Sequence, residues 1–156
     1  MSQFPSVPNA STAPYAAFLL RLALGVMFLA HGLTKLLVFT PAGTAQFFSS
    51  VGFPGFLAYP VIAFEVIGGI FLILGIVPRW VAAVAAVQLL FASSVHWGNG
   101  WAFAAPNGGG WEYPVFLAVA AAALALLGDG AYALRPSTGR RLSLIHISEP
   151  TRQAEI

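Results

Sequence analysis

The 156-residue chain contains no cysteine and few charged residues. Without cysteine, the chain itself can form no disulfide, no thiolate metal site and no cysteine-based redox relay. Charged residues make up 8% of the sequence, whereas they make up about a quarter of a typical soluble domain. The formal net charge of +2 is too small to indicate a nucleic-acid partner. These shortages exclude an ordinary soluble domain and all cysteine-based chemistry.

Apolar residues are abundant instead, at 58% of the sequence, and the mean hydropathy is +0.82. They form four continuous runs, each close to the roughly 20 residues with which a helix crosses the hydrocarbon core of a bilayer. The sequence therefore predicts an all-α integral membrane protein, a four-transmembrane-helix bundle in one domain. The predicted spans are 15–38, 57–77, 80–97 and 113–134, and the fourth is long enough only if it continues to 134.

The segments before and between the first two spans are less apolar. Residues 1–14 are polar and proline-rich and are predicted to be disordered, without the cationic region and cleavage site of a signal peptide. Residues 39–56 form the first long loop and are predicted to contain a short helix that lies at the membrane interface. Phe47, Phe48 and Val51 would cover one side of this helix.

The C-terminal residues 135–156 are predicted to form a disordered tail. Within it, residues 142–156 (LSLIHISEPTRQAEI) resemble a translated sequencing-adaptor read-through. On that interpretation the natural C terminus is not in this sequence, and the charged residues of the segment have no function. The alternative is a natural, exposed and disordered tail.

Cations near the span ends predict the orientation of the chain in the membrane. Arg79 lies between the second and third spans, Arg135, Arg140 and Arg141 follow the fourth, and the two long loops contain no lysine or arginine. Both termini are therefore predicted to be cytoplasmic, with the long loops outside. The outer surface would carry a belt of aromatic residues, namely Trp97, Trp101, Trp111 and Tyr113.

Five ionisable side chains within the predicted spans are the candidate site residues: Arg21, His31, Lys35, Glu65 and His96. Arg21, His31 and Lys35 recur on one face of the first span. A charged group that faces lipid costs about 2.5–3.5 kcal/mol on insertion scales, so these groups must face protein or trapped water. Lys35, Glu65 and both histidines lie in the outer half of the membrane, and Arg21 lies in the inner half. All five are candidates for ligand binding or proton handling, and none is assigned a catalytic role.

Structural alternatives exist for each of these residues. Arg21 suits an ion pair or a headgroup contact, and Lys35 suits an interfacial anchor. Glu65 suits a salt bridge to either of them, and each histidine suits a hydrogen-bonded packing role. The two histidines and Glu65 come from three spans without a closely spaced pair, so no metal site is predicted.

Small and polar residues form stripes on the second and third spans. Glycines follow Glu65 at helical spacing, and small residues of this kind let membrane helices approach closely. Gln88, Ala92 and His96 recur every four residues in the third span. Both stripes are therefore predicted to face other helices. The stripe of the second span consists of Glu65, Gly68, Gly69, Leu72 and Gly75.

These motifs, in this order, resemble the DoxX family of small four-helix bacterial membrane proteins. The matching positions are Arg21, Gly25, Phe28, His31, Gly32, Lys35, Gly52, Pro54, Glu65, Gly68, Gly69, Gly75, Arg79 and His96. The resemblance covers about residues 17–130. It implies a multi-pass protein of the bacterial cytoplasmic membrane with a link to redox complexes, but no established role for any matched residue.

The resemblance and the polar residues lead to three functional hypotheses. The first is a membrane subunit of a redox system that binds quinone, or another small molecule with a polar head, in the outer half of the bundle. His31 or His96 would hydrogen-bond the head, Glu65 would exchange a proton, and Lys35 or Arg21 would stabilise negative charge. The second is a structural or assembly subunit without catalysis, and the third is a proton-coupled permease that would need several copies of the chain.

The first hypothesis also predicts the partners of the chain. The sequence contains neither a G-x-G-x-x-G motif nor a cysteine cluster, so no intrinsic cofactor is predicted. Electrons would come from a membrane or peripheral redox protein, and quinone is the candidate ligand. A homo-oligomer is a further candidate assembly.

Overall fold

The computed structural model describes residues 12–105 and 108–137, which contain helices and no β-strand. Ile76 and Arg135 form an isolated β-bridge between two connecting segments. Short 3₁₀ turns lie at Gly55–Leu57 and Trp97–Asn99. The longer helices are α1 (Ala13–Leu33), which continues into the π-helical turn η1 (Thr34–Val38), α2 (Pro41–Ser50), α3 (Ala58–Leu74), α4 (Pro78–Ser94) and α5 (Glu112–Leu127). The predicted all-α class is confirmed.

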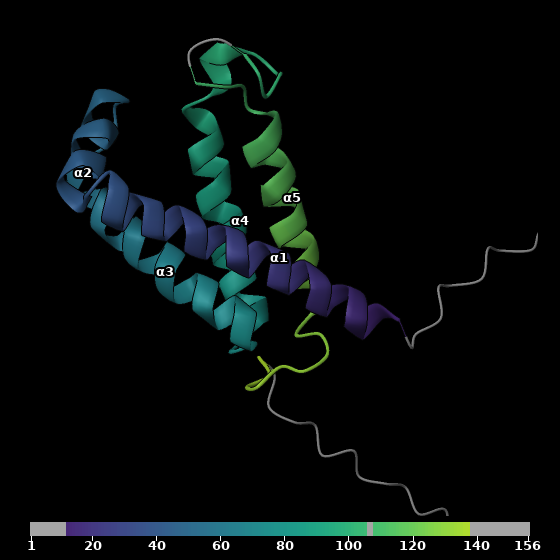
Figure 1. Cartoon of the computed structure of the whole chain (residues 1–156). Helices are drawn as coiled ribbons and strands as arrows, with labels where there is room; N and C mark the ends of the chain where they lie inside the picture. The colour runs from purple at the N-terminus through teal and green to yellow at the C-terminus, as the bar shows by residue number, and fades with distance from the viewer. Residues whose placement is uncertain (1–11, 106–107, 138–156) are drawn as a thin grey trace, which may run out of the picture.

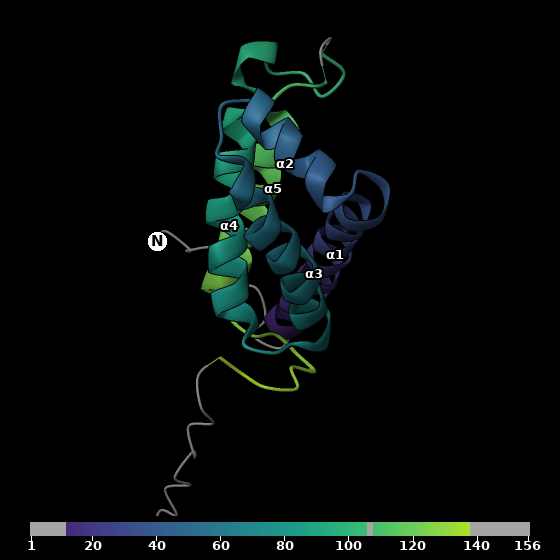
Figure 2. The same ribbon diagram turned by 90° about the vertical axis from the view of Figure 1, so that its left-hand side faces the viewer.

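The helices form two closely packed pairs (Figure 1). Helix α1 packs along α3 and α4 packs along α5, whereas contacts between the pairs are fewer. The two pairs diverge toward the end of the molecule that carries α2 and the α4–α5 loop. Figure 2 shows α2 lying over the beginning of α3 at this end. The divergence leaves space between the pairs, and this space contains the candidate site.

Glycines bring α1 and α3 into backbone contact. A Cβ atom on Gly69 would lie 2.7 Å from the backbone nitrogen of Leu29, and one on Gly25 would lie 2.9 Å from the carbonyl oxygen of Gly69. A Cβ atom on Gly32 would lie 2.9 Å from the Cβ atom of Glu65. The stripe predicted on the second span does face its neighbours, because Glu65, Gly68, Gly69 and Leu72 are buried.

The end of α5 differs from the prediction. The fourth span was expected to continue to 134, but the helix ends at Leu127, where Gly128 adopts a φ of 93°. The chain then turns back toward α1, and the carbonyl oxygens of Asp129 and Ala131 accept hydrogen bonds from Arg21. A helix through this segment would have used these carbonyl groups internally, and the glycine at 128 permits the turn.

In the part of the chain that the structure describes, two helical segments are long and apolar enough to cross a membrane, Ala13–Val38 and Gly55–Leu74, and Glu112–Leu127 is a shorter apolar helix. Large apolar side chains are exposed on the outside of all the long helices, as is typical of proteins surrounded by lipid. They include Leu19, Ile67, Val84, Phe116, Val119 and Leu126. The helix predicted within residues 39–56 is present as α2.

Candidate functional site

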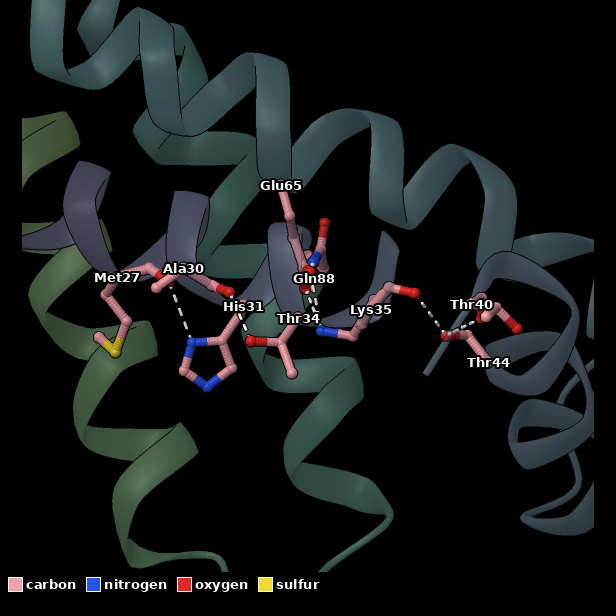
Figure 3. Close-up of polar contacts among 9 residues, drawn as sticks. All are labelled: Met27, Ala30, His31, Thr34, Lys35, Thr40, Thr44, Glu65 and Gln88. Atoms are coloured by element: carbon pink, nitrogen blue, oxygen red, sulfur yellow. Dashed lines mark hydrogen bonds and ion pairs between the residues drawn. The ribbon is translucent and has the colours of Figure 1, made fainter. Parts of the chain in front are cut away.

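A buried carboxylate near the middle of α3 is the centre of the site (Figure 3). Both oxygens of Glu65 accept hydrogen bonds from Nζ of Lys35, with distances of 2.9 Å to Oε1 and 2.7 Å to Oε2. The amide Nε2 of Gln88, on α4, donates to Oε1 at 2.9 Å. The side chain of Glu65 is only 9% exposed. Glu65, Lys35 and Gln88, hereafter the Glu65 cluster, therefore join η1, α3 and α4 by charge-assisted hydrogen bonds.

The π-helical turn η1 places Lys35 beside Glu65. Its wider hydrogen-bonding pattern is visible in the bond from the backbone nitrogen of Phe39 to the carbonyl oxygen of Thr34, at 3.0 Å. The hydroxyl of Thr44, on α2, donates to the carbonyl oxygen of Thr40 at 2.9 Å and lies 3.4 Å from that of Lys35. Helix α2 therefore packs against the turn and fixes its position. Such π-helical turns are frequent at functional sites.

The Glu65 cluster lies on the wall of a cavity of about 720 Å³ between the two helix pairs. This volume is within the range of about 300–1,000 Å³ that is usual for small-molecule sites. All five helices contribute to its lining, which is mostly apolar. Phe48 of α2, Phe64 of α3, Phe91 of α4 and Leu117 of α5 are examples. Few polar groups among many apolar ones are typical of sites for amphipathic ligands.

His31 and His96 also line the cavity. The Nδ1 atom of His31 lies 3.0 Å from the carbonyl oxygen of Met27, and that of His96 lies 3.1 Å from the carbonyl oxygen of Gly109. A carbonyl oxygen can only accept, so Nδ1 carries the proton in both rings. In the neutral ring, Nε2 is then a hydrogen-bond acceptor. The two histidines therefore offer acceptors, whereas Lys35 and Gln88 offer donors.

Arg21 lies away from the cavity, at the other end of α1. Its side chain is completely buried, and Nη1 donates to the carbonyl oxygen of Asp129 at 2.7 Å. Nη2 donates to the carbonyl oxygens of Ala131 and Tyr132, at 3.2 Å and 3.5 Å. The guanidinium carbon lies 5.3 Å from the centre of the Phe18 ring. Arg21 thus holds the segment after α5, and the structure does not bring it together with the other four candidates.

Sequence reasoning missed two residues of the site. Gln88 was predicted to lie on the polar stripe of its helix. It was not predicted to be a site residue, because its side chain is uncharged and only ionisable groups were candidates. Its position on the same stripe as His96 was the available signal. Tyr113 was assigned to an aromatic belt, yet it lines the cavity and its hydroxyl contacts the sulfur of Met27.

The side chains of the cavity do not form a metal centre of the usual kind. Among residues 12–105 and 108–137, no group of three His, Cys, Asp or Glu side chains could hold a metal ion. Glu65 binds Lys35 instead. Its other oxygen also accepts the hydrogen bond from Gln88, so the polar groups of the cavity wall are joined to one another by hydrogen bonds.

Comparisons with known proteins show the family of the chain. Residues 16–97, more than half of the chain, match the family model DoxX. A relative from Bacillus subtilis (strain 168), named "Putative oxidoreductase CatD", is 36% identical over 118 residues, which cover 76% of this chain and 83% of the relative. No solved structure matches the chain significantly. The chain belongs to the DoxX family of membrane proteins.

Proposed function

We propose that the chain is a four-span subunit of a redox system in the bacterial cytoplasmic membrane, and that it binds a quinone in the cavity between its helix pairs. The observation that carries the proposal is the apolar cavity of about 720 Å³ with the Glu65 cluster on its wall. The name of the relative and the family membership support a link to redox chemistry.

The residues of the cavity fit the head of a quinone or quinol. Lys35 and Gln88 carry donors that suit carbonyl oxygens, and the Nε2 atoms of His31 and His96 suit hydroxyl groups. Aromatic side chains such as Phe48 and Phe64 would enclose the ring. A bound quinone would supply the capacity to take up two electrons and two protons. Glu65 and the histidines would hold protons at the wall, and a partner protein would supply the electrons.

The proposed orientation follows from the cations. Both termini and Arg79 would lie on the cytoplasmic side, and α2 and the α4–α5 loop would lie outside. The Glu65 cluster would then be in the outer half of the membrane. Because α4 (Pro78–Ser94) and α5 (Glu112–Leu127) are shorter than a typical span, the bilayer would thin locally around them.

Quinone content of the purified protein tests the proposal. The protein is purified in mild detergent as wild type, as Glu65→Gln and as Glu112→Gln, which makes the same chemical change outside the cavity. We expect near-stoichiometric quinone in the wild type and in Glu112→Gln, and its loss from folded Glu65→Gln. Wild-type protein without quinone, even after reconstitution with added quinone, would rule the function out.

A structural subunit without catalysis is the second candidate, and one observation favours it. Glu65 is already neutralised by Lys35 and connects three helical segments, so the cluster could serve only to order the bundle. This alternative predicts that Glu65→Gln lowers the yield of folded protein and that no quinone accompanies the wild type.

A further inference from the structure

The cavity wall differs between the two sides of the molecule. On the α1–α5 side, the exposed lining residues are His31 and Tyr113, which are polar. On the α3–α4 side they are Pro60 of α3 and Val84, Val87, Phe91 and Ala92 of α4. No charged or hydroxyl-bearing side chain is among this second set. The exposed lining residues of the α3–α4 side are therefore all apolar, whereas Glu65 and Gln88 lie deeper on the same side.

The spacing of these residues shows where the opening lies. Val84, Val87 and Phe91 form one stripe along α4 and are 53%, 55% and 64% exposed, although each also lines the cavity. A residue that borders a cavity and is exposed at the same time marks a place where the cavity opens outward, so the cavity has a polar border at His31 and Tyr113 and an apolar border along α4. Contacts between α3 and α4 are fewer than those within each helix pair. Figure 2 faces this side and shows α4 next to α3 below α2.

We propose that the cavity opens between α3 and α4 into the hydrocarbon of the bilayer, and that its ligand is a long-tailed molecule whose tail lies in this opening while its small polar head lies at the Glu65 cluster. This inference rests on the proposed function and names the class of ligand: a lipid-soluble amphiphile that enters sideways from the membrane. A water-soluble ligand would not require an apolar opening along the length of α4.

Charge supports this assignment of head and tail. Lys35, Glu65 and Gln88 meet on the cavity wall, where η1, α3 and α4 come together and the side chain of Glu65 is only 9% exposed. A hydrocarbon tail placed there would meet desolvated polar groups, and a polar head placed outside the cavity, against the exposed faces of Val84, Val87 and Phe91, would lie in lipid without hydrogen-bond partners. One orientation satisfies both ends of the molecule.

Photolabelling with a fatty acid that carries a diazirine in its alkyl chain tests the opening. The full chain is reconstituted in vesicles of phosphatidylethanolamine and phosphatidylglycerol, and adducts are located by mass spectrometry. Phe116 and Val119 of α5 face away from the cavity and serve as positive controls. We expect adducts there and also on Phe64 and Leu117, which line the cavity.

Tryptophan substitutions on α4 are designed to block the opening. Val87→Trp should remove the adducts on Phe64 and Leu117 and leave those on Phe116, whereas Val119→Trp, the matched change on an outer surface, should leave the cavity adducts in place. Val84→Trp provides a second blocked variant if Val87→Trp does not fold. The opening is ruled out if the wild type shows no cavity adducts, or if the blocked variants retain them.

Competition with a long-tailed quinone separates this inference from the proposed function. If the quinone displaces the cavity adducts, both are supported. Cavity adducts that quinone leaves unchanged would keep the opening and reject quinone as the ligand. If quinone binds but the photolabel forms no adducts in the cavity, the proposed function is supported and the opening is ruled out.

Discussion

At the scale of single residues, Glu65 and Lys35 depend on each other. Their ion pair is largely removed from water, with side-chain exposures of 9% and 21%. Removing one partner of such a pair leaves an uncompensated charge in an apolar environment, whereas removing both leaves none. The energetic value of the pair is therefore best measured by changing the two residues separately and together.

We predict that Lys35→Met destabilises the protein by about 3–5 kcal/mol, the usual range for breaking a buried pair. The double variant Lys35→Met with Glu65→Gln should recover most of this loss. Thermal unfolding in a single detergent measures all three proteins. Equal stability of the single and double variants would show that the unpaired Glu65 carboxylate is not what destabilises Lys35→Met.

The contacts of Arg21 with the segment after α5 indicate a structural role. We predict that Arg21→Met lowers the free energy of unfolding by about 1–3 kcal/mol, the cost of one unsatisfied buried polar group, because its carbonyl acceptors are only partly buried. Arg79→Met, which changes an exposed arginine, should have little effect. Quinone per folded chain should be the same in both variants, because neither residue lines the cavity. A selective loss of quinone in Arg21→Met would return Arg21 to the list of ligand-binding candidates.

At the scale of elements, the α1–α3 contact has the least tolerance for added volume. We predict that Gly69→Ala separates these helices and costs about 1–3 kcal/mol, the range for overpacking, because the new Cβ would meet backbone atoms that cannot move independently.

Gly98→Ala is the matched control, since a Cβ there would have nothing within 4 Å. The stability lost through overpacking at Gly69 should exceed the stability of about 1 kcal/mol that replacing glycine by alanine usually adds to a helix. Unfolding temperatures of the two variants measure the difference. A Gly69→Ala protein as stable as the wild type would contradict the close packing of the two helices.

The elements themselves could largely be predicted from the sequence, because apolar runs and proline or glycine breaks mark their limits. The glycines at 128 and 130 also indicate the end of α5, but the roughly 20 residues that a span needs favoured a helix that continues to Leu134. The positions of Glu65 and Lys35 along their helices predicted that both lie in the outer half of the membrane, and the two residues form an ion pair in the structure. These positions could not choose between Lys35 and Arg21 as the partner of Glu65, because that choice depends on the π-helical turn and on the segment after α5, which are tertiary features.

At the scale of the whole molecule, the absence of cysteine allows the orientation to be tested with single introduced thiols. We predict that Gly98→Cys reacts with a membrane-impermeant maleimide added to intact spheroplasts. Leu134→Cys, at a site with 71% exposure, should react only after lysis. The reverse pattern would place the termini outside, and labelling of both residues in intact cells would contradict a single orientation.

The position of Arg21 also has a consequence for the synthesis of the chain. Its first acceptor, the carbonyl oxygen of Asp129, lies 108 residues later in the sequence. At usual ribosomal rates, about 5–20 s separate the translation of the two residues. During that time the first helix carries a guanidinium group whose final partners do not yet exist. The nascent helix therefore needs a temporary host for this charge, such as the insertion machinery or lipid headgroups, until α5 and the turn after it emerge.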